Sequence, residues 1–156
     1  MAFEIVGQRP STKEGEYFRR RSMWWAPLAD YMCKVAPEIT DQCESWQTNE
    51  GDGLDAERAA ALANRLDVEI REGRCERYAR IHKSMQEKLP EEPCFYCKGT
   101  GTKESAPQIG AGDMICDYCN GSGIARRLLW RLGHFSVENV QAFVVFLRGC
   151  GGFIIL

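Results

Sequence analysis

Two stretches of the sequence repeat one pattern of cysteine and glycine residues. "CFYCKGTG" begins at Cys94 and "CDYCNGSG" begins at Cys116, so the motif C-x-x-C-x-G-x-G occurs twice. Cys94, Cys97, Cys116 and Cys119 fit the spacing C-x2-C-x18-C-x2-C, which is typical of four-cysteine zinc sites. Each C-x-x-C turn places two sulfurs on one side of an ion, and the pair of turns completes a tetrahedron. We therefore predict one structural Zn2+ per chain, held by these four thiolates with no open position for a catalytic water.

The glycines that follow each cysteine pair fit the same interpretation. Gly99, Gly101, Gly121 and Gly123 let the chain turn sharply away from the metal, because glycine adopts positive φ at little steric cost. A redox-active C-x-x-C pair is the rival interpretation, and iron is a minor alternative to zinc. Two pairs in register, each followed by G-x-G, favour a metal site over a redox pair.

Residues 94–123 resemble the cysteine-rich zinc-binding repeat of DnaJ-type co-chaperones, which usually carry four such units and two zinc ions. The two units here imply one zinc, an arrangement similar to that of the small bacterial anti-TRAP protein. The resemblance covers about a fifth of the chain and carries over the four zinc ligands and their glycines. The J-domain tripeptide HPD does not occur in the sequence, so activation of a heat-shock ATPase is not implied.

Length, charge and cysteine usage limit the class of protein. A chain of 156 residues with 44% hydrophobic and 27% charged residues predicts a globular protein of one compact unit. The formal net charge of -2 argues against a protein that coats nucleic acid by bulk electrostatics. No signal-peptide pattern opens the sequence and no apolar segment reaches membrane-spanning length, so we expect a cytoplasmic protein without a membrane partner. The remaining cysteines show no ligand spacing, and we expect them to be buried thiols: Cys33, Cys43, Cys75 and Cys150.

The first half of the sequence predicts helices separated by polar segments. Residues 1–22 are polar and are expected to form a loop or arm, followed by a helix that has Pro27 in its first turn and stops at Pro37. At least one of Trp24 and Trp25 should lie in the core.

A second loop is expected before the clearest helix, which Asp55 can cap. The loop resembles a calcium loop, but with Gly53 at the turn position the first and last ligand positions are Thr48 and Ala59, which lack carboxylates. Because glycine weakens a helix interior, we favour a break at Gly73 between two helices over one long helix.

The second half of the sequence places one more helix after the cysteine motif. Ser136 can cap a helix that follows it, Gly149 suits the C-cap, and "GGFIIL" is either a short strand or an apolar tail. The predicted fold is therefore mainly α, with three or four helices and an inserted small four-cysteine zinc-binding β-hairpin module. The predicted organisation is an N-terminal helical region over 1–93, the zinc module over 94–123, and a C-terminal helix and apolar tail over 124–156.

The sequence offers a specific structural metal site and no recognisable catalytic arrangement. We expect a non-enzymatic, zinc-stabilised interaction module that binds a partner protein as an adaptor, assembly factor or inhibitor. The alternative is a nucleic-acid-binding regulator that uses Arg126, Arg127, Trp130 and Arg131, because basic and aromatic side chains together are common on nucleic-acid-binding surfaces. A homo-oligomer, and an enzyme whose site is assembled from scattered residues, also stay open.

Overall fold

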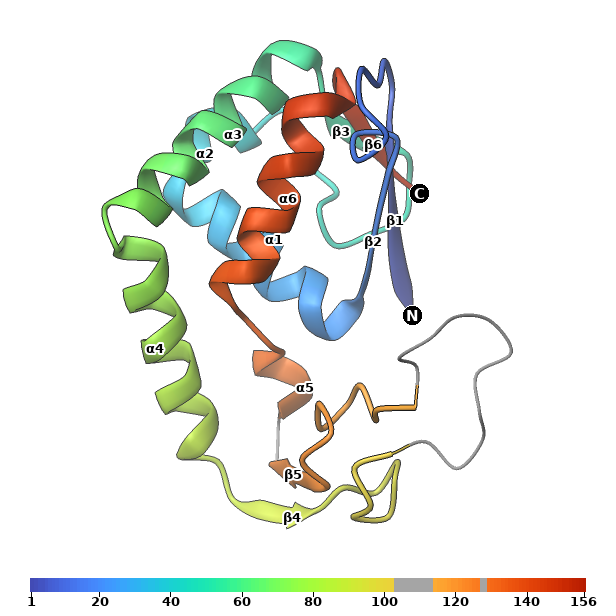
Figure 1. The fold of residues 1–156 in the computed structure, drawn as a ribbon, viewed down its shortest axis with the longest axis vertical. Helices are drawn as coiled ribbons and strands as arrows, with labels where there is room; N and C mark the ends of the chain where they lie inside the picture. The colour runs from blue at the N-terminus through green and yellow to red at the C-terminus, as the bar shows by residue number, and fades with distance from the viewer. Residues whose placement is uncertain (103–113, 127–128) are drawn as a thin grey trace. The chain divides into compact units, whose positions relative to one another are not determined.

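The computed structural model describes residues 1–102, 114–126 and 129–156, without the side chain of Trp130 (Figure 1). The chain divides into two compact units by its internal contacts. The first, which we call the main unit, consists of Met1–Ile81 and Gly133–Leu156. The second, which we call the cysteine unit, is His82–Leu132.

The main unit contains a four-stranded antiparallel sheet with the strand order β2-β1-β6-β3. Its strands are β1 (Ala2–Gly7), β2 (Tyr17–Arg21), β3 (Asp52–Leu54) and β6 (Phe153–Ile155). The last strand of the chain therefore lies inside the sheet and joins the N-terminal hairpin to β3, and both chain termini reach this sheet (Figure 1). In the hairpin, Phe3 lies opposite Arg20 and Ile5 opposite Phe18.

The prediction of a mainly α fold is wrong, because this sheet makes the fold one of mixed α/β class. The prediction of a loop or arm over residues 1–22 is wrong for the same reason, since β1 and β2 both lie entirely there. The alternation that makes these segments strands is short: Phe3 and Ile5 are buried while Glu4 between them is exposed. In β2 the run of three arginines at 19–21 hides this period of two, because Arg20 lies opposite the buried Phe3.

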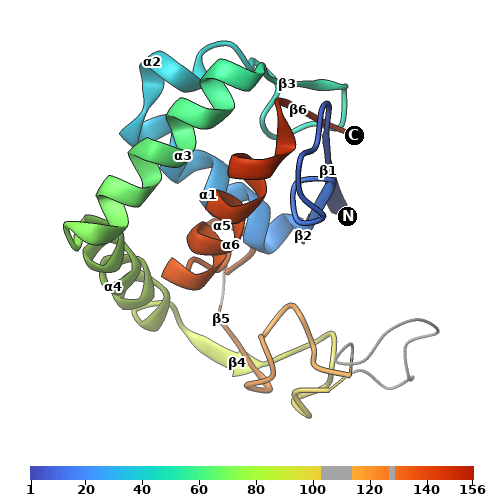
Figure 2. The ribbon, with the colours of Figure 1, turned by 45° about the horizontal axis from the view of Figure 1, so that its top comes forward.

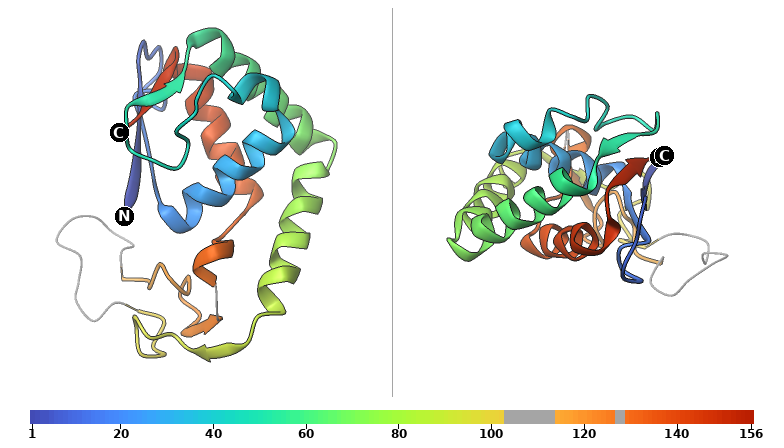
Figure 3. Two further views of the ribbon diagram at one scale, coloured as in Figure 1. Left: turned by 180° about the vertical axis from the view of Figure 1, so that it is seen from behind. Right: turned by 90° about the horizontal axis from the view of Figure 1, so that it is seen from above.

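Helices pack on one side of the sheet in the main unit (Figures 1 and 3). They are α1 (Ser22–Val35), the single turn α2 (Pro37–Thr40), α3 (Ala56–Arg71) and α6 (Val137–Cys150), and α4 (Arg74–Glu87) begins here. Helices α3 and α6 lie side by side (Figure 2). The core between helices and sheet is rich in aromatic side chains, which is why so short a sheet can bury a continuous apolar surface.

Trp25 lies at the centre of this core, which confirms the prediction that at least one of Trp24 and Trp25 is a core residue. Its side chain is fully buried, and its ring packs against Phe3, Trp46 and Phe143 at centroid distances of 5.9, 6.2 and 5.6 Å. The indole N–H donates to the Trp46 carbonyl at 2.7 Å, which satisfies its only polar group.

Helix α1 begins earlier than predicted, at Ser22, so Pro27 lies inside the helix. Proline has no N–H to donate to the carbonyl four residues before it. The structure satisfies that carbonyl from elsewhere, since the His134 N–H donates to the Met23 oxygen at 2.7 Å. Gly133 permits the approach: a Cβ there would lie 2.5 Å from the same oxygen.

The predicted break between α3 and α4 is confirmed. The Asp55 side chain caps α3 by accepting from the Arg58 N–H at 2.8 Å, and the helix ends at Arg71. Gly73 follows with φ of +76°, a left-handed conformation that glycine adopts most readily.

An ion pair bridges this break. The Glu69 side chain, only 4% exposed, accepts from two nitrogens of Arg74, from Nε at 3.0 Å and from a terminal nitrogen at 2.9 Å. Arg65 approaches the same carboxylate at 3.4 Å. The hydrogen bonds from Arg74 outweigh the effect of burial and lower the pKa of Glu69 below its ordinary value. The carboxylate form is therefore favoured in the folded protein.

Replacing this carboxylate should make the stability of the main unit less dependent on acid pH. Because the folded pKa of Glu69 is depressed, its contribution is present above the unfolded value of 4.5 and is lost as the pH falls through the lower folded value. We expect Glu69→Gln to lower the free energy of unfolding by about 1 to 2 kcal/mol at pH 7. That difference should shrink as the pH falls below 4.5 and through the lower folded pKa. Urea denaturation of both proteins across this range measures it, and a difference that stays constant with pH would contradict the assignment.

Helix α6 has its predicted N-cap but not its predicted C-cap. The Ser136 side chain accepts from the Asn139 N–H at 3.2 Å, whereas the C-cap is Gly151, with φ of +62°, and not Gly149. Gly149 is a helical residue whose missing side chain makes room for Thr12: a Cβ would lie 1.9 Å from the Thr12 hydroxyl.

The cysteines outside the motif lie in the main unit. Cys43, Cys75 and Cys150 are buried as predicted, while Cys33 is half-buried. Burial raises the pKa of the Cys43 thiol to about 12 and that of Cys75 to about 11, so both are protonated at neutral pH.

Candidate metal centre

Hydrogen bonds within the cysteine unit join segments that are distant in its sequence. Strands β4 (Glu91–Pro93) and β5 (Ile124–Arg126) pair antiparallel and bring the two ends of the motif region together. An isolated bridge pairs Thr102 with Ile115 farther along. The unit also contains the single turn α5 (Leu129–Leu132). The His82 Nε2 donates to the carbonyl of Leu132, the last residue of this turn, at 2.9 Å.

The four motif cysteines converge in the interior of this unit. Their side chains are at most 4% exposed, and their sulfur atoms all lie within 4.8 Å of one another. The Sγ atoms of Cys94 and Cys116 are 3.8 Å apart, and so are those of Cys97 and Cys119. Four sulfurs at about 2.3 Å from a zinc ion form a tetrahedron with edges of about 3.8 Å. The donor set and its spacing therefore fit a metal ion such as zinc.

The two motifs fold into equivalent knuckles with matching hydrogen bonds. The Gly99 N–H donates to the Cys94 carbonyl at 3.0 Å, and the Gly121 N–H donates to the Cys116 carbonyl at 3.1 Å. Backbone N–H groups also reach the sulfurs, from Gly101 to Cys97 Sγ at 3.1 Å and from Gly123 to Cys119 Sγ at 3.3 Å. Such donors stabilise thiolates and hold metal ligands in place.

Each knuckle also needs glycine for close contact with the other. Gly101 and Gly123 have φ of +78° and +73°. A Cβ on Gly101 would lie 2.3 Å from the Gly121 carbonyl oxygen, and one on Gly123 would lie 2.4 Å from the Gly99 oxygen. The G-x-G repeat therefore serves the packing of the two knuckles as well as their turns.

The environment shifts the pKa values of Cys94, Cys97 and Cys116 in different directions. Burial raises the pKa of Cys94 to about 12 and also raises that of Cys116. For Cys97, burial is outweighed by the hydrogen bonds from the Gly101 N–H and the neighbouring thiols, which lower its pKa to about 6. Cys97 is thus a thiolate at neutral pH. Cys94 and Cys116, whose pKa values are raised, would release their protons on binding a metal.

This arrangement can hold one metal ion and leaves no open coordination position for a substrate. Four protein sulfurs at tetrahedral corners fill the coordination shell, as in structural zinc sites. Among the described residues, the cluster is the one group of three or more His, Cys, Asp or Glu side chains placed to share an ion.

Of the basic and aromatic residues predicted to follow the motif as a patch, Arg126 is the one whose contacts are described in detail. The Arg126 guanidinium donates to the carbonyls of Glu87 and Leu89 at 2.9 and 3.1 Å and to the Glu91 carboxylate at 2.6 Å. Arg126 therefore ties β5 to the end of α4. Arg127 and the side chain of Trp130 lie outside the described residues, and Arg131 is exposed.

Comparison with protein-family models, with curated proteins and with solved structures found no match to the chain. Among the described residues, no helix combines the length and apolar character needed to cross a membrane.

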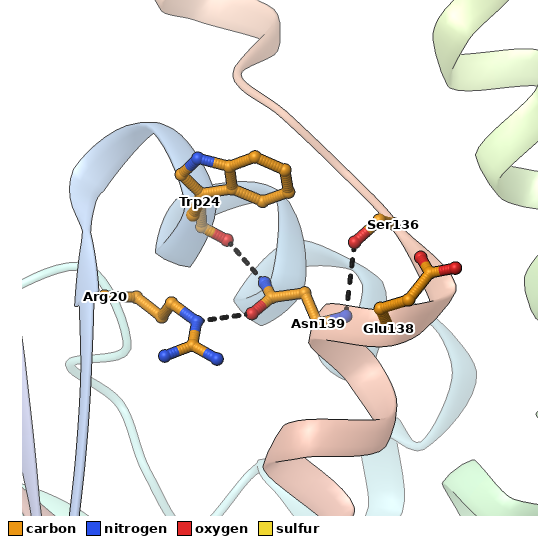
Figure 4. Close-up of a pocket in the computed structure, with 5 residues that line it drawn as sticks. All are labelled: Arg20, Trp24, Ser136, Glu138 and Asn139. Atoms are coloured by element: carbon orange, nitrogen blue, oxygen red, sulfur yellow. Dashed lines mark hydrogen bonds between the residues drawn. The ribbon is translucent and has the colours of Figure 1, made fainter. Parts of the chain in front are cut away.

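The main unit has a pocket of its own, of about 310 Å³ (Figure 4). It is lined by Arg20, Trp24, Ser136, Glu138 and Asn139. Arg20 Nε donates to the Asn139 side-chain oxygen at 2.6 Å, and the Asn139 amide donates to the Trp24 carbonyl at 3.3 Å (Figure 4). The Arg20 guanidinium also lies 4.1 Å from the centre of the Phe18 ring. These contacts join β2, α1 and α6, so we assign the polar groups of this pocket a structural role.

The side chain of Asn139 should therefore contribute more to stability than the N-cap of α6, in which the Ser136 side chain accepts from the Asn139 N–H. Asn139 is only 6% exposed, and Asn139→Ala would leave the Nε of the half-buried Arg20 without the acceptor that Asn139 provides. We expect the free energy of unfolding to fall by about 2 to 3 kcal/mol. The matched substitution Ser136→Ala removes only the N-cap and should cost about 1 kcal/mol. Urea denaturation compares the two, and an equal or smaller loss for Asn139→Ala would refute the role.

Proposed function

We propose that this protein is a non-enzymatic interaction protein whose cysteine unit is held together by one structural zinc ion. The observation that carries the proposal is the composition of that unit's interior. Among the described residues of the unit, the buried cluster comprises the four cysteines and Ala125, with Tyr118 packed against them. So small an apolar core cannot stabilise an independent fold, and a bound metal would supply the missing stabilisation.

A closed sulfur shell favours a structural over a catalytic role for the metal. A catalytic zinc needs a position for water or substrate, which a fourth protein ligand removes. The zinc would instead fix the shape of a surface, and we propose that this surface binds a partner protein, with the protein acting as an adaptor, assembly factor or inhibitor.

The paired knuckles support the resemblance to the DnaJ-type zinc-binding repeat. Equivalent hydrogen bonds in both copies of C-x-x-C-x-G-x-G are what a repeated zinc knuckle requires. A chaperone-like role would consist of holding a partner chain, because the sequence has no HPD tripeptide for driving an ATPase. Free thiols and a thiolate-bound zinc suit a reducing compartment, and we propose the cytoplasm.

Affinity capture from the native host tests the function. The zinc-loaded protein and Cys94→Ser would be used as paired baits, with zinc measured on each. A partner protein bound by the first and lost by the second would support an interaction surface held by zinc. A second outcome is the capture of nucleic acid instead, with an affinity that falls steeply as the salt concentration rises. That result would replace the proposal with the alternative of a nucleic-acid-binding regulator that uses the residues after the motif, Arg126, Arg127, Trp130 and Arg131.

A further inference from the structure

The pocket of the main unit contains two charged groups that its structural contacts leave without an ionic partner (Figure 4). The Arg20 guanidinium uses Nε for the Asn139 side-chain oxygen at 2.6 Å and one terminal nitrogen for the Arg19 carbonyl at 2.8 Å. Its second terminal nitrogen has no acceptor among the described residues. Glu138 lines the same pocket, and within the described part of the chain its carboxylate takes part in no hydrogen bond or ion pair.

The surroundings of Arg20 favour an anion. Arg20 is half-buried, and the groups that contact its guanidinium are all neutral: the Asn139 amide, a backbone carbonyl and the Phe18 ring, whose centre lies 4.1 Å away. Burial lowers the pKa of Arg20, because removal from water disfavours the charged form. A buried cation is costly unless an anion accompanies it. A ligand carboxylate would supply that anion and would accept from the unused nitrogen in a charge-assisted hydrogen bond.

Glu138 sets a second condition on the ligand. In the view of Figure 4 its side chain and that of Arg20 lie on opposite sides of Asn139, and no ion pair joins the two charges. A ligand with a carboxylate alone would bring a like charge into the pocket of Glu138. A ligand that also carries an ammonium group would match both charges of the pocket. The two unpaired groups therefore select a zwitterion.

Trp24 supplies the aromatic wall of the pocket. Its ring packs against the His134 ring at a centroid distance of 5.1 Å, which holds it in place. An aromatic ring offers a ligand a large apolar contact at a low cost in conformational freedom. The volume of about 310 Å³ lies at the lower end of the range for small-molecule sites. It suits a molecule of the size of a single amino acid with an apolar side chain.

We propose that this pocket binds a free α-amino acid whose carboxylate accepts from Arg20, whose ammonium group donates to Glu138 and whose apolar side chain packs on Trp24. Asn139 would be a positioning residue, because it holds the Arg20 Nε. The site lies wholly in the main unit and uses none of the metal-centre cysteines. It therefore goes beyond the proposed function and does not depend on it.

Three probes with the same phenyl group separate the contributions of the two charges. They are phenylalanine, 3-phenylpropanoate, which lacks the ammonium group, and 2-phenylethylamine, which lacks the carboxylate. Each is titrated into the zinc-loaded full chain at pH 7, and binding is followed by NMR of the Trp24 indole N–H and the Asn139 side-chain amide. We expect phenylalanine to shift both signals and to bind about tenfold more tightly than either of the other probes.

Substitutions with matched controls assign each charge to its residue. Glu138→Gln should weaken phenylalanine about tenfold without weakening 3-phenylpropanoate. Its control is Glu57→Gln, because Glu57 lies two residues after the N-cap of α3, as Glu138 does in α6, and is no part of the pocket. Arg20→Gln should weaken phenylalanine and 3-phenylpropanoate about tenfold each, whereas Arg19→Gln, one residue earlier in β2, should weaken neither.

The outcomes decide the proposal even where a variant is unstable. Glu138 is exposed, so Glu138→Gln gives a folded protein to test if Arg20→Gln does not fold. Equal affinity for all three probes, no shift with phenylalanine at millimolar concentration, or unchanged phenylalanine binding by Glu138→Gln would each overturn the proposal. Tightest binding of 3-phenylpropanoate would overturn it as well, because the pocket would then be a site for simple organic carboxylates.

Discussion

Cys94→Ser and Cys119→Ser are each expected to abolish high-affinity zinc binding and to unfold the knuckles between residues 94 and 123. The two substitutions remove one ligand from each knuckle, and a serine hydroxyl is a poor ligand for zinc at neutral pH. Of the buried cluster among the described residues, three cysteines and Ala125 would remain, which cannot hold a fold. Structural zinc contributes on the order of 10 kcal/mol in small zinc peptides, so the loss should exceed the stability of the unit.

Zinc content and amide NMR of the purified variants measure this result together. Cys43→Ser is the matched control, because it replaces a buried thiol of the main unit that is not part of the cluster. It should keep one zinc per chain and the signals of the knuckles. Full zinc occupancy in both Cys94→Ser and Cys119→Ser would refute the four-cysteine assignment.

A chelator should reproduce the effect without a substitution. The main unit has its own core of aromatic and aliphatic side chains, and none of the residues described within 94–102 and 114–123 belongs to it. Removing the metal should therefore collapse the signals of the knuckles while those of Trp25 and Phe143 persist. Loss of both sets at the same chelator concentration would mean that the two units fold as one.

The cysteine cluster could be predicted from sequence because a metal site leaves a local record. Two ligands three residues apart and the glycines after them are all set within a single knuckle. The exposed rings of Phe95 and Tyr96 lie in the same stretches, at the variable positions between the cysteines. The repeated motif does not predict an aromatic residue at these positions, because the second knuckle has Asp117 where the first has Phe95.

The sheet could not be predicted from the same kind of local pattern. Strands β3 and β6 are three residues each, too short for any period to be recognised, and each depends on a partner distant in sequence. Leu54, for example, is buried because Phe153 pairs with it. The helices α3 and α6 carry their signals within themselves, in the side-chain caps Asp55 and Ser136, and these were predicted correctly.

The contact between the N-terminal hairpin and the end of α6 could not be predicted from the sequence, and it predicts a large loss of stability when Gly15 is replaced. The loop between β1 and β2 lies against the last turn of the helix. The Ser11 N–H donates to the Gly149 carbonyl at 2.8 Å and the Arg9 N–H donates to the Cys150 carbonyl at 3.1 Å. Gly15 faces the same turn: a Cβ there would lie 2.1 Å from the Gly149 carbonyl carbon and 2.7 Å from the Cys150 nitrogen.

Gly15→Ala is therefore expected to lower the free energy of unfolding by about 3 kcal/mol or more, at the upper end of overpacking effects, because a backbone atom cannot rotate away as a side chain can. Either the loop detaches and both hydrogen bonds break, or the end of α6 shifts and disturbs the following strand. Urea denaturation gives the magnitude, and hydrogen exchange at Ser11 reports whether the loop has detached.

Gly73→Ala separates this clash from a general cost of replacing glycine. Gly73 has positive φ, but nothing lies within 4 Å of the position that a Cβ would take, so alanine there meets only backbone strain of about 1 kcal/mol. Equal losses for the two substitutions would mean that the loop yields freely. A clearly larger loss for Gly15→Ala would instead show that the N-terminal hairpin is fixed in place by the last turn of a helix more than a hundred residues away in sequence.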